Sequence, residues 1–136
     1  MKKQKRKLVL HLKDNRKIVG QLSKFFKKIQ IMYNIVCICS AIAHCYEMNG
    51  KFDEGIEFME STVKNWEPCF ILACHNFWHN SLMYIEKGNY EAALTLFDQE
   101  IYKRSKSNQM LDIVDAASLL SRLEMEGLFR FFVRLL

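Results

Sequence analysis

Turn-forming residues are scarce in this chain of 136 residues, which contains one proline and five glycines. A β-sandwich or barrel needs a turn every few residues, so this composition argues against one. Alternating apolar and polar residues are also rare, whereas apolar residues recur at intervals of three and four. The length allows one domain at most, or part of one. The sequence therefore predicts an all-α protein.

Paired cysteines of the kind that build disulfide or zinc frameworks are missing as well. The five cysteines are an odd number, and none belongs to a Cys-x-x-Cys pair. Cys37 and Cys39 stand two residues apart, so on a helix they point to different faces and suit zinc poorly. All five lie within apolar stretches, and we expect no secretory signal before them. The sequence thus predicts reduced, buried thiols and a cytoplasmic protein.

Acidic residues are almost absent from residues 1–30, which hold eleven lysines and arginines but only Asp14. The rest of the chain holds nine basic and fourteen acidic side chains, so the net charge of +5 hides a basic arm followed by an acidic body. The arm is typical of a solvated tail that later becomes a helix, and a patch for nucleic acid or an anionic membrane is the alternative. Nucleic acid is the less favoured partner, because no aromatic residues interleave with the lysines for base stacking. The helix would carry an apolar face formed by Ile18, Leu22, Phe25 and Ile29.

The stretch from Ile29 to Tyr46 is apolar on average, and polar residues interrupt it at Gln30, Asn34, Ser40 and His44. A helix that spans a membrane needs about 20 mainly apolar residues. The interruptions favour a buried helix, and we expect no transmembrane segment.

Residues 74–104 carry the clearest pattern in the chain. A first apolar stripe recurs at threes and fours in Cys74, Phe77, Trp78, Ser81, Leu82, Tyr84 and Ile85. Gly88 and Asn89 interrupt it, and a second stripe follows in Tyr90, Ala93, Leu94, Phe97 and Ile101. Because so short a turn leaves two helices antiparallel, these residues are predicted to form a helical hairpin. The aromatic residues Trp66, Phe77 and Trp78 are predicted to pack in the core, as are the methionines Met48, Met59, Met83, Met110 and Met125.

This pattern recurs along the chain at a nearly constant interval. Residues 50–55, GKFDEG, match residues 88–93, GNYEAA, and a tyrosine stands four residues before each glycine. Gly88 follows Gly50 by 38 residues, and Gly127 follows Gly88 by 39. Such an internal repeat predicts stacked helical hairpins, each of which buries its apolar face against the next.

The repeated strings GKFDEGIEF and GNYEAALTLF look like the turn and second helix of a tetratricopeptide repeat. More narrowly, AHCYEMNGKFDEGIEFME, ACHNFWHNSLMYIEKGNYEAALTLFD and MLDIVDAASLLSRLEMEG resemble the tetratricopeptide repeat protein 38 family over about residues 42–127. The resemblance implies a right-handed α-solenoid of about two and a half repeats and assigns no reaction. We expect a basic arm at 1–30 and a helical repeat domain at 31–136, with hairpins at about 34–65, 69–104 and 109–136.

The first helix of each hairpin lines the concave surface in repeats of this type, so polar residues there are the candidates for a partner groove. His75 and His79 stand one turn apart and face the same side, as do His44 and Glu47. The predicted groove consists of His44, Glu47, His75, Asn76 and His79, with Asp115 as a weaker addition. The leading hypothesis is a scaffold, without catalytic residues, cofactor or metal, that binds a protein or peptide.

Two other functions stay open. The same histidines are able to hold a metal ion or serve a hydrolase-like reaction, since carboxylates lie on adjacent helices. However, the string HNFWH has Asn76 where a zinc protease carries its glutamate base. The other alternative is the basic arm as an adaptor for nucleic acid or an anionic membrane. The apolar tail LFRFFVRLL is predicted to form a short amphipathic helix over the last hairpin, or else to be a cut end that exposes core. We expect self-association if the chain is a fragment.

Overall fold

The computed structural model describes the backbone of residues 2–70 and 72–128, and the side chains of this part from Lys17 onward except Val19. The described residues form helices and no strand, which confirms the predicted all-α class. The elements are α1 (Lys2–Met48), α2 (Phe52–Trp66), α3 (Ala73–Glu86), α4 (Tyr90–Leu96), the π-helical turn η1 (Phe97–Ile101), α5 (Tyr102–Ser105) and α6 (Met110–Met125). The predicted tail helix lies outside the described residues from position 129 onward.

The chain divides into two compact units, Met1–Met32 and Tyr33–Leu136. The first unit is the early part of α1, and its described side chains from Gln21 to Ile31 are exposed. The second unit holds the last turns of α1 and all later helices. The predicted groove residues all belong to the second unit.

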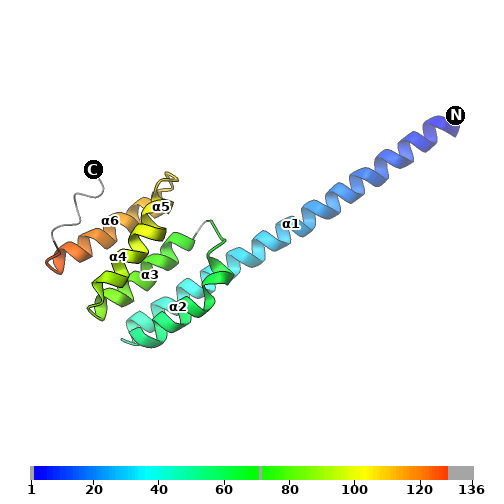
Figure 1. Ribbon diagram of the computed structural model, residues 1–136. Helices are drawn as coiled ribbons and strands as arrows, with labels where there is room; N and C mark the ends of the chain where they lie inside the picture. The colour runs from blue at the N-terminus through cyan, green and yellow to red at the C-terminus, as the bar shows by residue number, and fades with distance from the viewer. Residues whose placement is uncertain (1, 71, 129–136) are drawn as a thin grey trace. The chain divides into compact units, whose positions relative to one another are not determined.

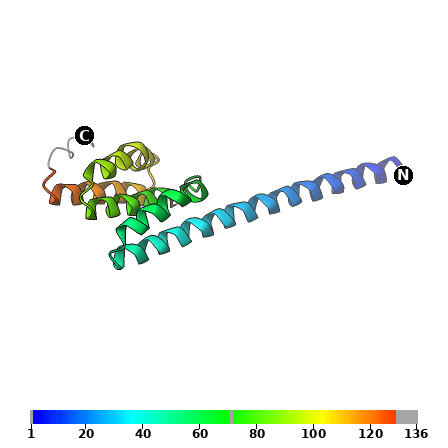
Figure 2. The ribbon, with the colours of Figure 1, turned by 60° about the horizontal axis from the view of Figure 1, so that its bottom comes forward.

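Helix α3 lies at the centre of the second unit, where it packs against α2, α4, η1 and α6 (Figures 1 and 2). Ten of its fourteen residues are buried, so the helix is enclosed rather than covered on one side. Its apolar stripe packs as predicted; for example, the ring of Phe77 meets that of Trp66 edge to face at 4.8 Å between centroids. Polar side chains are buried on α3 too, namely Asn76, His79, Asn80 and Ser81.

The three evenly spaced glycines end three helices in the same way. Gly50, Gly88 and Gly127 all have positive φ angles, of 65°, 70° and 86°. In each case the glycine N–H donates to the carbonyl three residues before it, and the next N–H donates to the carbonyl five residues before itself. This pair of bonds is the Schellman arrangement, which satisfies carbonyls that a helix end leaves free. The repeat found in the sequence therefore corresponds to one turn geometry used three times.

Small residues follow two of these turns where helices pack closely. Gly55 on α2 is buried, and a Cβ atom there would overlap Met83 Sδ and stand 3.0 Å from Tyr46 Cβ. Ala93, at the matching position of α4, is fully buried as well. A small residue at this position thus lets the second helix of a hairpin approach its neighbours.

The second helix of the central hairpin differs from the prediction of one continuous α-helix. It changes to a π-helical turn at Phe97–Ile101 and resumes as α5. Both ends of that turn are buried, with Phe97 at 1% exposure and Ile101 at 0%. The wider π-helical turn places one extra residue between Phe97 and Ile101. An apolar pattern at intervals of three and four does not reveal such an insertion.

The prediction that all five methionines pack between helices is only partly correct. Met59 and Met83 are fully buried, but Met48, Met110 and Met125 are largely exposed. The latter three lie within the first or last turn of their helices, where fewer neighbours surround a side chain. The cysteines divide similarly: all are free thiols, Cys39, Cys69 and Cys74 are buried, and Cys45 is exposed.

One part of α1, Gly20–Met48, is long and apolar enough to cross a membrane by length and composition. Its last turns carry Val36, Cys39 and Ala43, which are buried in the second unit. Core helices pass the same test of length and composition, so the absence of a transmembrane segment stays a prediction.

We predict that Gly55→Leu lowers the free energy of unfolding by about 1–3 kcal/mol, because the side chain would overpack the contact with Met83 and Tyr46. Denaturant unfolding followed by circular dichroism measures the change. Glu57→Leu, at an exposed position of the same helix, is the control and should change stability little. Equal stability of the two variants would show that α2 does not pack this closely.

Candidate functional site

Three histidines from two helices meet in the second unit. His44 lies near the end of α1, and His75 and His79 lie one turn apart on α3. One ring nitrogen from each can be chosen such that the three lie within 4.8 Å of one another. The ring of His79 is central, with centroids 4.1 Å from His44 and 4.5 Å from His75. We call these three residues the histidine cluster.

Two carboxylates extend the histidine cluster into a chain of close polar contacts. Glu47 Oε1 lies 2.8 Å from His79 Nδ1, and His79 Nε2 lies 3.1 Å from His75 Nε2. His75 Nδ1 in turn lies 3.1 and 3.2 Å from the two carboxylate oxygens of Asp115. Since an ionised carboxylate only accepts, each Nδ1 carries the proton that it donates. The chain links α1, α3 and α6.

Burial differs sharply across the histidine cluster. The His79 side chain is 0% exposed, that of His75 is 21% exposed, and that of His44 is 54% exposed. Burial lowers the pKa of His79, and the hydrogen bond and charge of Glu47 oppose this shift only in part. His79 is therefore a neutral imidazole near pH 7, and the histidine cluster opens to solvent on the side of His44.

The six predicted groove residues do not share one accessible surface. Five of them, His44, Glu47, His75, His79 and Asp115, do come together, although helix spacing pairs only His75 with His79 and His44 with Glu47. Asn76 lies apart: it is fully buried and its amide donates to the Val36 carbonyl at 3.3 Å. A groove role for Asn76 is therefore not supported, because its position one residue from His75 turns it toward α1 and into the core.

Direct contact with a partner is also not supported for His79 and Asp115, which are 0% and 3% exposed. The sequence predicts which face of its helix each residue lies on, but how deeply that face is buried depends on how α1 and α6 pack against α3. Of the predicted set, His44 offers the most accessible side chain, and part of His75 adjoins it.

Nucleophilic chemistry has little support around the histidine cluster. Cys74 is buried, and its Sγ lies 4.0 Å from the Ile101 carbonyl rather than beside a histidine. Burial, strengthened by the nearby carboxylates of Asp112 and Asp115, raises the pKa of the Cys74 thiol far above its ordinary range. The thiol is protonated near pH 7, and a protonated thiol is a poor nucleophile.

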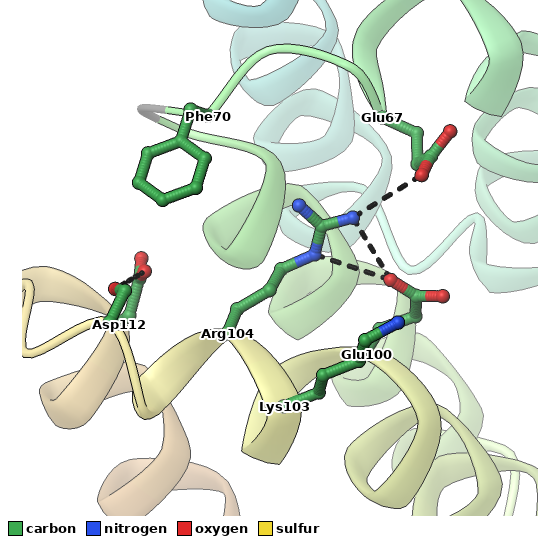
Figure 3. A pocket seen from close by; sticks show the side chains of 7 residues that line it. Glu67, Phe70, Glu100, Lys103, Arg104 and Asp112 are labelled. Carbon is green, nitrogen blue, oxygen red and sulfur yellow. Dashed lines mark hydrogen bonds and ion pairs between the residues drawn. The ribbon is translucent and has the colours of Figure 1, made fainter.

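A second polar feature, which the sequence reading missed, lines a pocket of about 280 Å³ (Figure 3). Arg104 there donates to Glu100 at 3.0 and 3.2 Å and reaches Glu67 at 3.5 Å. The i,i+4 spacing of Glu100 and Arg104 in the sequence is the pattern that predicts this ion pair. Because two carboxylates already surround the guanidinium, an incoming anion would have to displace one of them.

The comparisons with known proteins add no assignment. No family model matches the chain, and no solved structure matches it. The resemblance to the tetratricopeptide repeat protein 38 family therefore remains a prediction.

We predict that His79→Ala lowers the free energy of unfolding by about 1–3 kcal/mol, because it empties a fully buried position and removes the hydrogen bond from Nδ1 to Glu47. His44→Ala, at the exposed end of the same histidine cluster, should change stability by far less. Thermal unfolding of both variants measures the difference. If His79→Ala were as stable as the natural chain, the imidazole would not be a structural member of the core.

We further predict that stability falls as the pH decreases below the ordinary pKa of histidine, about 6.5. The folded protein keeps His79 neutral because its pKa is lowered, whereas the unfolded chain takes up a proton there. Acidification thus favours the unfolded state. Denaturant unfolding between pH 7.5 and 5.5 should show a steeper loss for the natural chain than for His79→Gln. An equal loss of stability with falling pH in the natural chain and in His79→Gln would contradict the lowered pKa of His79.

Proposed function

We propose that the chain is a non-catalytic helical-repeat scaffold of the tetratricopeptide type, which binds a protein or peptide partner. The observation that carries the proposal is the threefold use of one glycine turn, at intervals of 38 and 39 residues. Regular turns of this kind stack hairpins into an elongated array, and such arrays serve widely as binding surfaces. The family resemblance points the same way.

The proposed groove lies where α1, α3 and α6 present the accessible edge of the histidine cluster. His44 and the partly exposed His75 offer ring nitrogens and aromatic faces, and Trp78 stacks on His75 with an interplanar angle of 12°. Glu47 adds a carboxylate that is 19% exposed. A polar peptide segment fits this mixture of imidazole, carboxylate and aromatic surface.

Helix α6 carries a second accessible surface with different chemistry. Four large apolar side chains near its start are exposed, namely Met110, Leu111, Ile113 and Val114. In a helical array this face is the one against which a further helix packs. This apolar face of α6 serves as the control surface when binding to the groove is tested.

We predict that affinity capture followed by mass spectrometry identifies partners that His44→Ala loses and that Leu111→Ser/Val114→Ser retains. His44 is exposed, so the loss would reflect a missing contact, and unchanged circular dichroism would verify the fold. Partners that Leu111→Ser/Val114→Ser loses and His44→Ala retains would place the binding surface on α6. Identical partners for the natural chain and both variants would refute the groove.

A second candidate function has its own supporting observation in the first unit. The apolar face of Ile18, Leu22, Phe25 and Ile29 is exposed, and the flanking lysines are exposed too: Lys17, Lys24 and Lys28. An apolar face beside lysines is typical of helices that lie on an anionic membrane. This arrangement favours a membrane surface over nucleic acid, for which charge alone would suffice.

We predict that the chain binds vesicles of anionic phospholipid and that Leu22→Glu/Phe25→Glu abolishes this binding. Gln21→Glu/Ser23→Glu adds the same charge to the helix without changing the apolar face, and it should retain most of the binding. Equal losses in the two variants would indicate a purely electrostatic contact, and preferential binding to RNA would reject the membrane.

A further inference from the structure

The nitrogen atoms at the centre of the histidine cluster pose an electrostatic problem. Each Nδ1 of His75 and His79 directs its proton to a carboxylate, so in neutral rings both Nε2 atoms are bare. These two Nε2 atoms lie 3.1 Å apart. Two lone pairs at this distance repel each other unless a positive charge lies between them.

A proton between the two nitrogens is one way to remove the repulsion, and on His79 burial works against it. An imidazolium at His79 would be a charge in a side chain with no exposed surface. A metal ion is the other way, and the geometry suits it. Metal–nitrogen bonds of about 2.0–2.1 Å in a tetrahedral site hold two ligand atoms about 3.3 Å apart. The observed separation of 3.1 Å is close to that value.

The partners of the two rings match the surroundings of metal-bound histidines. A histidine that binds a metal through one nitrogen almost always donates its other N–H to a carboxylate or carbonyl. Glu47 and Asp115 accept these bonds from His79 and His75. Their two negative charges also offset the charge of a divalent ion, because imidazole ligands themselves bring no charge to a metal.

His44 supplies the third nitrogen. One of its ring nitrogens lies within 4.8 Å of the ligand atoms of His75 and His79, and its exposed side chain can rotate to close the remaining gap. Three imidazoles suit zinc and its neighbours in the first transition series, whereas calcium and magnesium prefer oxygen ligands. The exposed side of His44 leaves room for a water molecule as fourth ligand.

We propose that His44, His75 and His79 form a binding site for one divalent zinc ion, with Glu47 and Asp115 holding the imidazoles of His79 and His75 in place. The bound ion joins α1 to α3 directly and connects both to α6 through Asp115. This proposal is independent of the scaffold function, since metal binding is measured on the purified chain without any partner.

The test is zinc binding by the full chain, measured in competition with a chromophoric chelator after removal of metal. We expect one zinc ion per chain, a higher melting temperature with zinc, and visible absorption typical of four-coordinate cobalt when Co²⁺ replaces zinc. His44→Ala should lose the site while keeping its helicity, because His44 is exposed. Asp115→Asn should weaken zinc binding about 10–100-fold.

The matched control is His11→Ala, which removes the fourth histidine of the sequence. It should bind zinc like the natural chain. The proposal is overturned if the natural chain takes up no zinc from the chelator, if His44→Ala binds as tightly as the natural chain, or if His11→Ala loses binding equally. Uptake of copper or nickel without zinc would overturn the assignment of the ion.

Discussion

The buried imidazole of His79 ties together the centre of the molecule, because a buried N–H group needs an acceptor and its neighbours must lie where the ring reaches them. His79 has no exposed surface, and its two nitrogens meet Glu47 from α1 and His75 from its own helix. His75 in turn donates from Nδ1 to the carboxylate of Asp115 on α6. Because an unpaired polar group in the interior costs about 1–3 kcal/mol, three helices are held at the spacing that these contacts allow.

The glycine turns are the second feature on which the fold depends. Each satisfies the last carbonyls of a helix, and the turns at Gly50 and Gly88 reverse the chain so that the helices on either side lie antiparallel at short range. Gly55 and Ala93 then allow the second helices to approach. The turns decide which helices are neighbours, while the polar chain decides which faces of α1, α3 and α6 meet.

The proposed scaffold and the proposed zinc site are compatible with each other in this architecture. A repeat array is open along its length, so the faces of its helices need additional fixing where polar residues replace an apolar core. A metal ion between α1 and α3 would provide that fixing at the place where the apolar contacts of α3 give way to His75 and His79. The same ion would keep a coordination position open toward solvent beside His44, where the groove is proposed.

The sequence by itself determined the helical class, the hairpin turns at Gly50 and Gly88 and the end of α6 at Gly127, because periodicity and glycine conformation are local properties. Helical spacing also placed His75 with His79 and His44 with Glu47. Burial was decided only by the tertiary structure: Asn76 and His79 have polar side chains that local rules assign to a surface, yet α3 is covered from several sides. The pairing of His75 with Asp115, 40 residues away, likewise depends on how α3 packs on α6, and no interval within one helix encodes such a contact.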